Sequence, residues 1–581
     1  MTAARRLVVG LVTAGMTVGP IGCATRPQVE PLRSKQEVLD VELSEAAAIE
    51  QDEKRKEDQV DQRLRVASMA WDVEQPELAR ENLVEATSFM AALTPEKDFH
   101  KRAESATRLL GDKEREKYFL GDPHEQLFAY LYLGILDFQA GDYGKALGSF
   151  RSAHLADEGS RAEGYKSDCY LALLLEGVTC RMLDDEPGMD EAFRLAERAF
   201  AFRQRMPLLK EAFYMGAAEY LTAHSGEKDQ ERLDALFPLV FGQLPIALTA
   251  DLEPHGAVDQ AFGGARLLLE EEDRRERSDE AKDVLKRYSG KTDEALEDLG
   301  ALQSLVLSNI TDSRMAATLA AERAFGALIE RCNAPETNAF ILHQVGAGPA
   351  KIRLGKYGQI VQIRPNPCAL HRVVTTVRRL DGAGGSPMLA SISVLGESVD
   401  YQASTRGGRE MDHILEGRAK FRDAMNVSAT LSGTVASAAL CVAMVQATTA
   451  IVTTTTVVTP TATAAGSAGY ATTTTTTTST AGVGAATTAL AVAGAAFLLY
   501  QGSKILSDAA HPEGDVRGWH ELPSRIFFTC AALEPGEYEL RSEYFDVVAR
   551  QLPERSTRIG FVVEQGHPSM VLAGSPWDPQ R

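Results

Sequence analysis

The stretch LYLGILDFQAGDYGKALGSFRSAHLAD, residues 131–157, constrains the fold more than any other part of the chain. Its apolar residues recur every three or four positions on both sides of the turn at 141–143, which predicts two helices joined by a short connection. Small residues at Gly134 and Ala146 allow the two helices to approach closely, and Phe150 is then expected to face the next helix. A helix pair of this kind cannot bury its apolar face alone, so we expect neighbouring pairs.

This pattern resembles a tetratricopeptide repeat (TPR), in which pairs of antiparallel helices stack on one another. Weaker copies occur upstream in WDVEQPELARENLVEATSFM and downstream in DEPGMDEAFRLAERAF. We therefore expect helical repeats over 66–225 and further helices over 226–335. By analogy of fold alone, such a solenoid presents a concave groove to a peptide or protein partner. The residues predicted to pack the repeats are Gly134, Gly141, Tyr143, Ala146, Phe150 and Ala192.

Short runs rich in β-branched and aromatic residues, separated by glycine and proline, occupy 336–412 and 511–581. Such runs predict strands, and their number suggests a pair of antiparallel sheets. The segment 413–510 between the two halves is expected to be an insertion. The predicted fold class is therefore α+β and multidomain: an N-terminal TPR-like α-solenoid, then an antiparallel β-sandwich-like domain with an inserted apolar helical hairpin.

No charged residue occurs between Asp423 and Lys504. Two segments in this region, Met425–Ile451 and Gly482–Gly502, are long enough to cross a bilayer as helices. Their alanine, glycine and serine residues equally favour close packing of helices within the protein. The threonine-rich stretch between them predicts a low-complexity loop, because β-branched threonine is a mediocre helix former. Three arrangements stay open: a helical hairpin packed on the β-domain, which we favour, a membrane hairpin, and a segment without order.

The chain begins with a basic pair, Arg5 and Arg6, followed by an apolar stretch and small residues up to Cys23. This pattern is typical of a secretory signal over 1–22. The Gly-Cys junction resembles a bacterial lipobox, although Pro20 stands where leucine is usual. Cleavage there would make Cys23 the lipidated N-terminus, in the outer membrane and facing the periplasm. A plain secreted protein and an uncleaved anchor are the alternatives.

Residues 23–65 are charged and poor in aromatic side chains, which predicts a tether or a solvated spacer helix. The chain has a formal net charge of −20. This acidity argues against nucleic acid and anionic lipid as partners, because both would be repelled. Six cysteines remain beside Cys23, too few for a disulfide scaffold. Cys169 and Cys180 could pair only if the helix between them broke, so buried thiols are favoured.

Three short elements occur in the order found in a family of uncharacterised bacterial TPR-containing lipoproteins, which this chain resembles over most of its length outside the tether. They are a Gly-Asp-Tyr repeat turn, a Gly-x-x-Pro-x-Lys element, and an Asp-x-Arg-x-Trp-x-x-Leu-Pro element followed by Gly-x-Tyr. The resemblance implies an envelope location, no established activity, and a distant link to cell-wall synthesis through lipoproteins that activate penicillin-binding proteins. The matching residues are Gly141, Asp142, Tyr143, Gly346, Pro349, Lys351, Asp515, Arg517, Trp519, Leu522, Pro523, Gly536 and Tyr538.

Asp515, Arg517 and Trp519 alternate along a segment expected to be extended, so their side chains would point the same way. One interpretation is structural, with Asp515 paired to Arg517 and Trp519 packed on the β-domain. The other makes them, together with Lys351, a surface that binds a partner. We favour the structural interpretation.

No catalytic pattern is present in the sequence: there is no HExxH, Walker A, GxSxG or CxxC motif. GAGPAK at 346–351 loses a backbone N–H to Pro349 and lacks the hydroxyl residue of a phosphate loop, which predicts a tight turn. We expect no metal and no cofactor. The sequence favours a non-enzymatic envelope lipoprotein that binds proteins through its solenoid groove. A membrane-inserting assembly protein that uses 425–502 and a cryptic wall- or glycan-acting enzyme are the alternatives.

Overall fold

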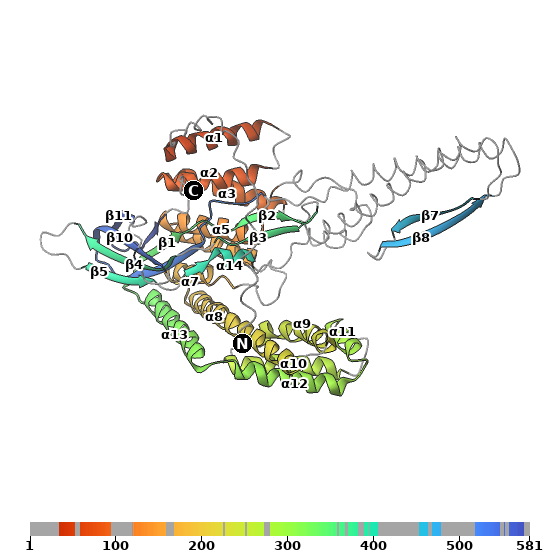
Figure 1. Cartoon of the computed structure of the whole chain (residues 1–581). Coiled ribbons are helices and arrows are strands. Elements are labelled where there is room, and N and C mark those ends of the chain that lie inside the picture. The colour runs from red at the N-terminus through yellow and green to blue at the C-terminus, as the bar shows by residue number, and fades with distance from the viewer. Residues whose placement is uncertain are drawn as a thin grey trace, which may run out of the picture.

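The chain is a mixture of helices and sheets, with helices up to residue 333 and mostly strands after it (Figure 1). The predicted mixed α+β class is therefore confirmed. The computed structural model describes residues 34–52, 58–93, 119, 121–157, 168–224, 227–249, 253–271, 279–356, 360–366, 370–380, 388–393, 396–404, 453–462, 468–477, 517–546, 551 and 557–574.

The first helices lie in chain order, and each contacts the next described helix. One apolar core runs through them from Leu39 to Phe200 and continues into the sheets. The helices are α1 (Lys35–Gln51), α2 (Gln59–Asp72), α3 (Pro76–Leu93), α5 (Pro123–Gln139), α6 (Tyr143–Asp157), α7 (Tyr170–Met182) and α8 (Glu186–Ala223).

The turn between two paired helices has the same geometry at three places. Glu74, Gly141 and Asp184 adopt positive φ angles of 61°, 76° and 54°. In each case the next residue donates its backbone N–H to a carbonyl of the preceding helix, at 2.8, 2.9 and 2.9 Å. This is the left-handed cap that commonly ends a helix, for which glycine is the usual residue. The turn expected at 141–143 is present, and Glu74 and Asp184 form it without glycine.

A glycine in the first helix of two pairs makes room for a phenylalanine of the second. A Cβ added to Gly134 would lie 2.6 Å from the ring of Phe150, and one added to Gly177 would lie 2.5 Å from the ring of Phe193. The phenylalanine follows its glycine at the same separation in both pairs. We expected Phe150 to face the next helix, but its ring packs inside its own helix pair, on the glycine that lets the two helices approach.

The other residues expected to pack the repeats lie in or beside the same core. Ala146 and Ala192 are fully or almost fully buried. Tyr143 is half-buried, and its ring centroid lies 5.0 Å from that of Phe138 in an edge-to-face contact. This geometry is favourable for aromatic pairs and holds the start of α6 against the end of α5.

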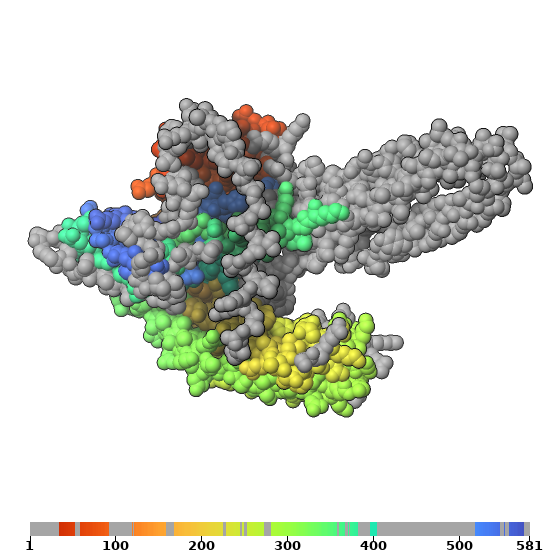
Figure 2. Space-filling model, viewed as in Figure 1, coloured from red at the N-terminus to blue at the C-terminus, as the bar shows by residue number. Residues whose placement is uncertain are grey.

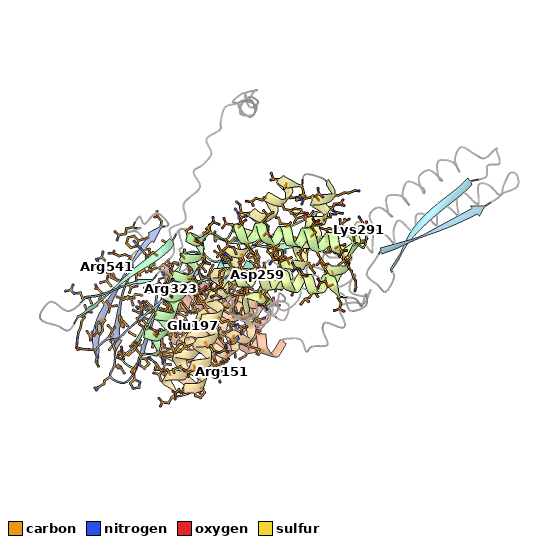
Figure 3. The ribbon with its side chains drawn as sticks, turned by 90° about the horizontal axis from the view of Figure 1, so that it is seen from below. Arg151, Glu197, Asp259, Lys291, Arg323 and Arg541 are labelled. Carbon is orange, nitrogen blue, oxygen red and sulfur yellow. The ribbon has the colours of Figure 1, made fainter. Side chains whose placement is uncertain are left out.

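Helix α8 passes from this first core into a second one. Phe200 belongs to the first core and Phe202 to the second. Figure 2 shows the additional helices as a block of their own, and Figure 3 shows this block, marked by Asp259 and Lys291, away from the sheets, marked by Arg541. The helices are α9 (Glu227–Thr249), α10 (Pro254–Glu270), α11 (Asp279–Arg287), α12 (Thr292–Ser308) and α13 (Asp312–Asn333), of which α13 runs back along α8 to the sheets.

Two four-stranded sheets follow, with strand orders β12-β1-β9-β6 and β11-β10-β4-β5. The strands are β1 (Ala339–Val345), β4 (Leu370–Arg379), β5 (Met388–Ser393), β6 (Gly396–Ser398), β9 (Arg525–Ala531), β10 (Gly536–Asp546), β11 (Thr557–Val563) and β12 (Ser569–Ala573). A short helix, α14 (Val399–Ser404), follows β6, and a separate hairpin is formed by β2 (Ala350–Leu354) and β3 (Ile360–Arg364).

The expectation of purely antiparallel sheets is wrong at one pairing. Strand β1 pairs antiparallel with β9 but parallel with β12. Parallel neighbours need a long connection between them, and the chain from the end of β1 to the start of β12 includes the whole second sheet. The last strand therefore returns to the first across the molecule, which no local pattern indicates.

The sheet that contains β1 is the middle layer of three. Successive side chains of a strand point to opposite faces. Phe340 and Leu342 belong to the core shared with the helices, whereas Ile341 belongs to a core shared with Val377 of β4 and Leu540 of β10. Every residue of β1 is buried. Helices thus cover one face of this sheet, and the second sheet covers the other.

The segment expected to be a tether is part of the folded body from residue 35 onward. Leu39, Ala46 and Ile49 of α1 are buried, and α1 packs against α2. Their spacing places them on one face of a helix. Because they are diluted among charged residues, the composition suggested a tether or a solvated spacer helix, and for 35–52 and 58–65 that expectation is wrong.

The threonine-rich stretch forms strands and not the loop that we expected. β7 (Thr453–Ala462) and β8 (Ala468–Thr477) pair antiparallel along their whole length. The β-branched side chain that makes threonine a mediocre helix former also favours strands. The two apolar segments expected to form a helical hairpin, Met425–Ile451 and Gly482–Gly502, lie outside the described residues. Of the helices that the structure describes, none is both long and apolar enough to cross a membrane.

Candidate functional site

Lys351 of β2 lies in a buried network of ion pairs. Its side chain is 4% exposed, and its Nζ lies 2.8 Å from Glu125 and 2.9 Å from Asp122. It also donates to the backbone carbonyl of Arg517 at 2.9 Å. Burial alone would lower the pKa of this ammonium group, but the two carboxylates outweigh burial and raise the pKa above its usual value. Lys351 therefore stays charged and holds β2 to the start of α5.

Trp519 joins the same network from the element that resembles the lipoprotein family. Its backbone N–H donates to Glu125 Oε1 at 2.7 Å, and its indole N–H donates to Ser68 Oγ of α2 at 2.7 Å. Arg517 pairs with Asp58 at 2.8 Å. The element is thus fixed against both α2 and α5.

The structure brings together three of the four residues considered for partner binding, Lys351, Arg517 and Trp519. Asp515 lies outside the described residues. The three side chains are buried, so they join parts of the chain and offer no surface to a partner. Arg517 pairs with Asp58, and the pairing expected with Asp515 falls outside the described residues.

A second buried ion pair joins α8 to β6. Arg203 pairs with Glu397, and both side chains are buried. The guanidinium of Arg203 also lies 3.9 Å from the ring centroid of Tyr401 in α14. Gln402 donates to Asp168 at 2.9 Å, just before α7. These contacts fix residues 396–404 against the helices, and their burial again indicates a structural role.

The inner face of the helix stack, where a solenoid would present its groove, is covered by the chain's own sheet. The ring of Phe138 in α5 packs edge-to-face against that of Phe340 in β1, with 6.0 Å between the ring centroids. Gln139 donates its side-chain N–H to the carbonyl of Met570 in β12 at 2.8 Å. Most of α5 is buried and apolar on all sides, which is typical of an interior helix. A partner could reach this face of α5 only by displacing β1 and β12.

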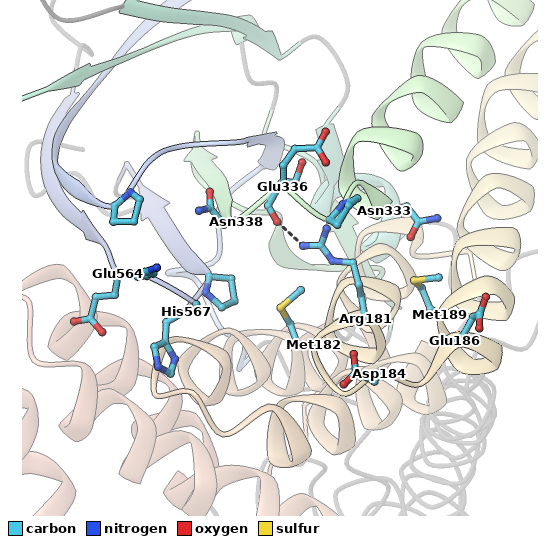
Figure 4. Close-up of a pocket in the computed structure, with 16 residues that line it drawn as sticks. Arg181, Met182, Asp184, Glu186, Met189, Asn333, Glu336, Asn338, Glu564 and His567 are labelled. Carbon is cyan, nitrogen blue, oxygen red and sulfur yellow. Dashed lines mark hydrogen bonds between the residues drawn. The ribbon is translucent and has the colours of Figure 1, made fainter.

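An open groove lies at the edge where the helices meet the sheets, and we call it the junction groove. It encloses about 790 Å³. Four segments form it: 181–189 at the turn from α7 to α8, 333–338 after α13, Pro535 before β10, and 564–568 between β11 and β12 (Figure 4). They meet because β1 lies between β12 and β9. Sequence reasoning missed this groove, since no motif links the four segments.

Arg181 holds one wall of the junction groove in place. Its guanidinium donates to the carbonyl oxygen of Ala334 and to that of Thr337 at 2.6 Å, and Figure 4 shows the second of these bonds. The same group lies 5.5 Å from the ring centroid of Phe340. Burial lowers the pKa of Arg181 from its ordinary value, although an arginine side chain remains charged. Its donors serve the backbone of the wall, which positions residues 334–337.

The rim of the junction groove is acidic. Met182 and Met189 are half-buried and contribute apolar surface. Within the described ranges, no group of three or more histidine, cysteine, aspartate or glutamate side chains is placed to hold a metal ion. The rim is suited to a positively charged, extended polypeptide. Its exposed carboxylates are those of Asp184, Glu186, Glu336 and Glu564.

Comparisons of the chain with protein-family models, with curated proteins and with solved structures give no match.

Proposed function

We propose that this chain is a non-enzymatic cell-envelope lipoprotein that acts as a scaffold for a protein partner. In this proposal the signal segment 1–22 is removed, and a lipid on Cys23 anchors the protein in the outer membrane, facing the periplasm. The observation that carries the proposal is the junction groove, an open acidic groove whose walls are held by packed helices and sheets. This groove takes the place of the inner solenoid face as the partner site.

The body of the scaffold is proposed to be a TPR-like solenoid over 66–225 that carries a β-sandwich-like domain. Support for the solenoid comes from the repeated left-handed turns and from the repeated contact of a phenylalanine on a glycine. Support for the sandwich comes from the core that the two sheets share. Solenoids of this kind commonly serve as binding scaffolds, and the concave surface is the usual site.

The proposed occupant of the junction groove is an extended protein segment that carries lysine or arginine. The four rim carboxylates are exposed, and Arg181 donates from both of its terminal guanidinium nitrogens to the groove wall. Charge complementarity of this kind raises the association rate and the specificity more than the affinity. Met182 and Met189 offer adaptable apolar surface on which the aliphatic stems of long cationic side chains can pack. The family resemblance suggests an envelope protein involved in wall assembly as the source of this segment.

A peptide-binding measurement tests the groove. The probes are a fluorescent nonapeptide of alternating lysine and alanine and its counterpart with glutamate in place of lysine. We expect the lysine peptide to bind the folded protein, the glutamate peptide not to bind, and added salt to weaken the lysine complex. The double variant Glu336→Lys/Glu564→Lys should weaken binding at least about tenfold, a loss of about 1.4 kcal/mol.

The matched control reverses two exposed carboxylates outside the junction groove, Glu231→Lys in α9 and Glu297→Lys in α12. It changes the net charge of the protein by the same amount. Equal weakening by both double variants would show that the peptide senses only overall charge, and the groove would be wrong as the partner site.

The lipid anchor is tested separately, with the full chain and its Cys23→Ala variant. We expect the N-terminal peptide of the mature protein to carry the mass of a lipid on Cys23, and the protein to fractionate with membranes. The variant should be released by carbonate extraction. An unmodified Cys23 with the leader intact would refute the lipoprotein assignment.

A further inference from the structure

Two cysteines from distant parts of the chain lie beside each other beneath the junction groove. Cys332 is next to the last residue of α13, and Cys530 is on β9. Their sulfur atoms are 3.4 Å apart, although the residues are separated by 198 positions. Both side chains are buried, with 0% and 5% exposure. The pair is therefore part of the contact that docks α13 onto the sheet.

The backbone around the pair is held by contacts other than the sulfur atoms. Asn338 donates its backbone N–H to Ala531 at 3.2 Å, and its side chain exchanges two hydrogen bonds with the backbone of Leu533, at 2.8 and 2.9 Å. A disulfide has a sulfur separation of about 2.05 Å. The two sulfur atoms would therefore need to approach by only about 1.4 Å, a distance within reach of side-chain rotation.

We propose that Cys332 and Cys530 form an intramolecular disulfide when the chain meets an oxidising thiol–disulfide couple, such as a protein disulfide oxidant. The Cys530 thiolate attacks the disulfide of the oxidant to give a mixed disulfide, and Cys332 then displaces the oxidant. Two thiols lose two protons and two electrons in total, and the oxidant leaves as a dithiol. The exchange takes place as α13 docks on β9, when the two sulfur atoms are already neighbours but the oxidant can still reach them, since the finished contact is buried.

The surroundings of the pair favour this order of attack. Accepting a hydrogen bond from the Cys332 thiol lowers the pKa of Cys530, and the nearby Arg331 and Arg181 guanidinium groups lower it further. The thiolate is the nucleophile in disulfide exchange, so a lowered pKa makes Cys530 the first to react. The Cys332 thiol donates a hydrogen bond to Cys530 and is buried, and both effects raise the pKa of Cys332.

The other two described cysteines contrast with this pair. Burial raises the pKa of Cys169, and it raises the pKa of Cys180 to about 11. Both lie at or within α7, where they cannot approach each other without breaking the helix. Cys368 and Cys441 lie outside the described residues. We therefore expect oxidation to be selective for Cys332 and Cys530.

The disulfide has a consequence for the junction groove. It would link the end of α13, which leads into wall residues 333–338, to β9, which leads into Pro535 of the same groove. Two of the four segments that form the groove would then be joined by a covalent bond close to it. The inference concerns this contact alone and does not depend on what the groove binds or on where the protein resides.

The experiment uses the full chain, unfolded under reducing conditions and refolded in glutathione buffers that range from reducing to oxidising. Thiols are trapped with acid, alkylated and mapped by mass spectrometry after digestion. We expect a linked peptide that contains Cys332 and Cys530 to exceed half occupancy while Cys169 and Cys180 remain alkylated. The oxidised protein should also denature at a temperature several degrees above that of the reduced protein.

Two variants complete the test. Cys530→Ser should abolish the linked peptide, whereas Cys180→Ser should leave its yield unchanged. Complete alkylation of Cys332 and Cys530 in the most oxidising buffer would overturn the proposal, and so would equal yields of links to other cysteines. Because the main measurement is made on the unaltered chain, a folding defect in a variant does not affect the outcome.

Discussion

The two faces of the sheet β12-β1-β9-β6 are packed by different means. On the side of the helices, buried charges pair across long sequence separations: Arg203 pairs with Glu397 of β6, and in the separate β2–β3 hairpin Lys351 pairs with Glu125. On the side of the second sheet, the polar group at the centre is the neutral imidazole of His343. It lies 2.8 Å from Thr375 Oγ1 and 3.2 Å from Ser542 Oγ, between apolar side chains.

This difference reflects how the partners of each face are connected. The two sheets contact each other through strands with regular registers, and apolar side chains with a few hydroxyl groups suffice there. The helices and the sheet are separate units, and a wrong docking position would leave a buried lysine or glutamate without its partner. Buried ion pairs add little net stability but penalise such alternatives heavily. We infer that the charges on the helix side specify how the two units dock.

The largest expected effect comes from removing one charge on the helix side. Lys351→Met leaves the carboxylates of Glu125 and Asp122 buried without their cation, which should lower the free energy of unfolding by about 3–5 kcal/mol. Urea denaturation followed by tryptophan fluorescence, to which Trp519 contributes, measures this loss. Lys228→Met on the surface of α9 is the control and should change stability by less than about 0.5 kcal/mol. Similar values for the two variants would contradict a docking role for Lys351.

The sheet side should respond to pH. Burial lowers the pKa of His343 from 6.5 to about 3, so the unfolded chain binds a proton between these values and the folded chain does not. The contribution of the neutral His343 to the free energy of unfolding is therefore fully present above pH 6.5. It falls by about 1.4 kcal/mol for each pH unit below 6.5, which amounts to about 2 kcal/mol at pH 5. His343→Gln should remove this part of the pH dependence. Parallel stability profiles for the variant and the unaltered chain between pH 7 and 5 would refute the prediction.

A smaller effect is expected inside the helix stack, away from both faces of the sheet. Gly134→Ala places a Cβ against the ring of Phe150, and overpacking of about 1–3 kcal/mol should exceed the gain in helix propensity of about 1 kcal/mol. Thermal denaturation should show a lower midpoint. Adding Phe150→Leu should restore part of the loss.

Gly300→Ala in α12 is the matched control, because no atom lies within 4 Å of the added Cβ. It should stabilise the protein by up to about 1 kcal/mol. If Gly134→Ala stabilised the protein, the two helices could move apart without cost. The contact between Gly134 and Phe150 would then not require glycine, and the prediction would be wrong.

The sequence allowed us to predict the parts of the fold that depend on neighbouring residues. The small residues Gly134 and Ala146 predicted a tight helix pair in α5 and α6, and β-rich runs after residue 335 predicted strands. The packing of α1 against the body was missed because Leu39, Ala46 and Ile49 are few among charged residues, although their spacing carried the signal. The strands β7 and β8 were missed because threonine was considered only as a poor helix former.

The candidate site could not be predicted in the same way. Lys351 and Trp519 were singled out by resemblance to a family, yet the sequence around their common partner Glu125 carries only the capping-box pattern of a helix start, which gives no sign of contact with either residue. The junction groove depends on the parallel pairing of β1 with β12. Such a pairing is decided by the packing of the whole molecule, because any of several apolar strands could occupy that edge.

The strands β6 and β9 determine where the long segment between them leaves the folded body and where it returns. Val399 donates its N–H to the carbonyl of Ser524 at 3.0 Å, and the Ser524 hydroxyl donates to Asp400 at 2.6 Å, although Asp400 and Ser524 are 124 positions apart. The chain therefore leaves the sheet after β6 and re-enters it before β9 at neighbouring positions. Because closing a longer loop costs only slightly more entropy, evolution can lengthen, shorten or exchange that segment without rebuilding what lies on either side.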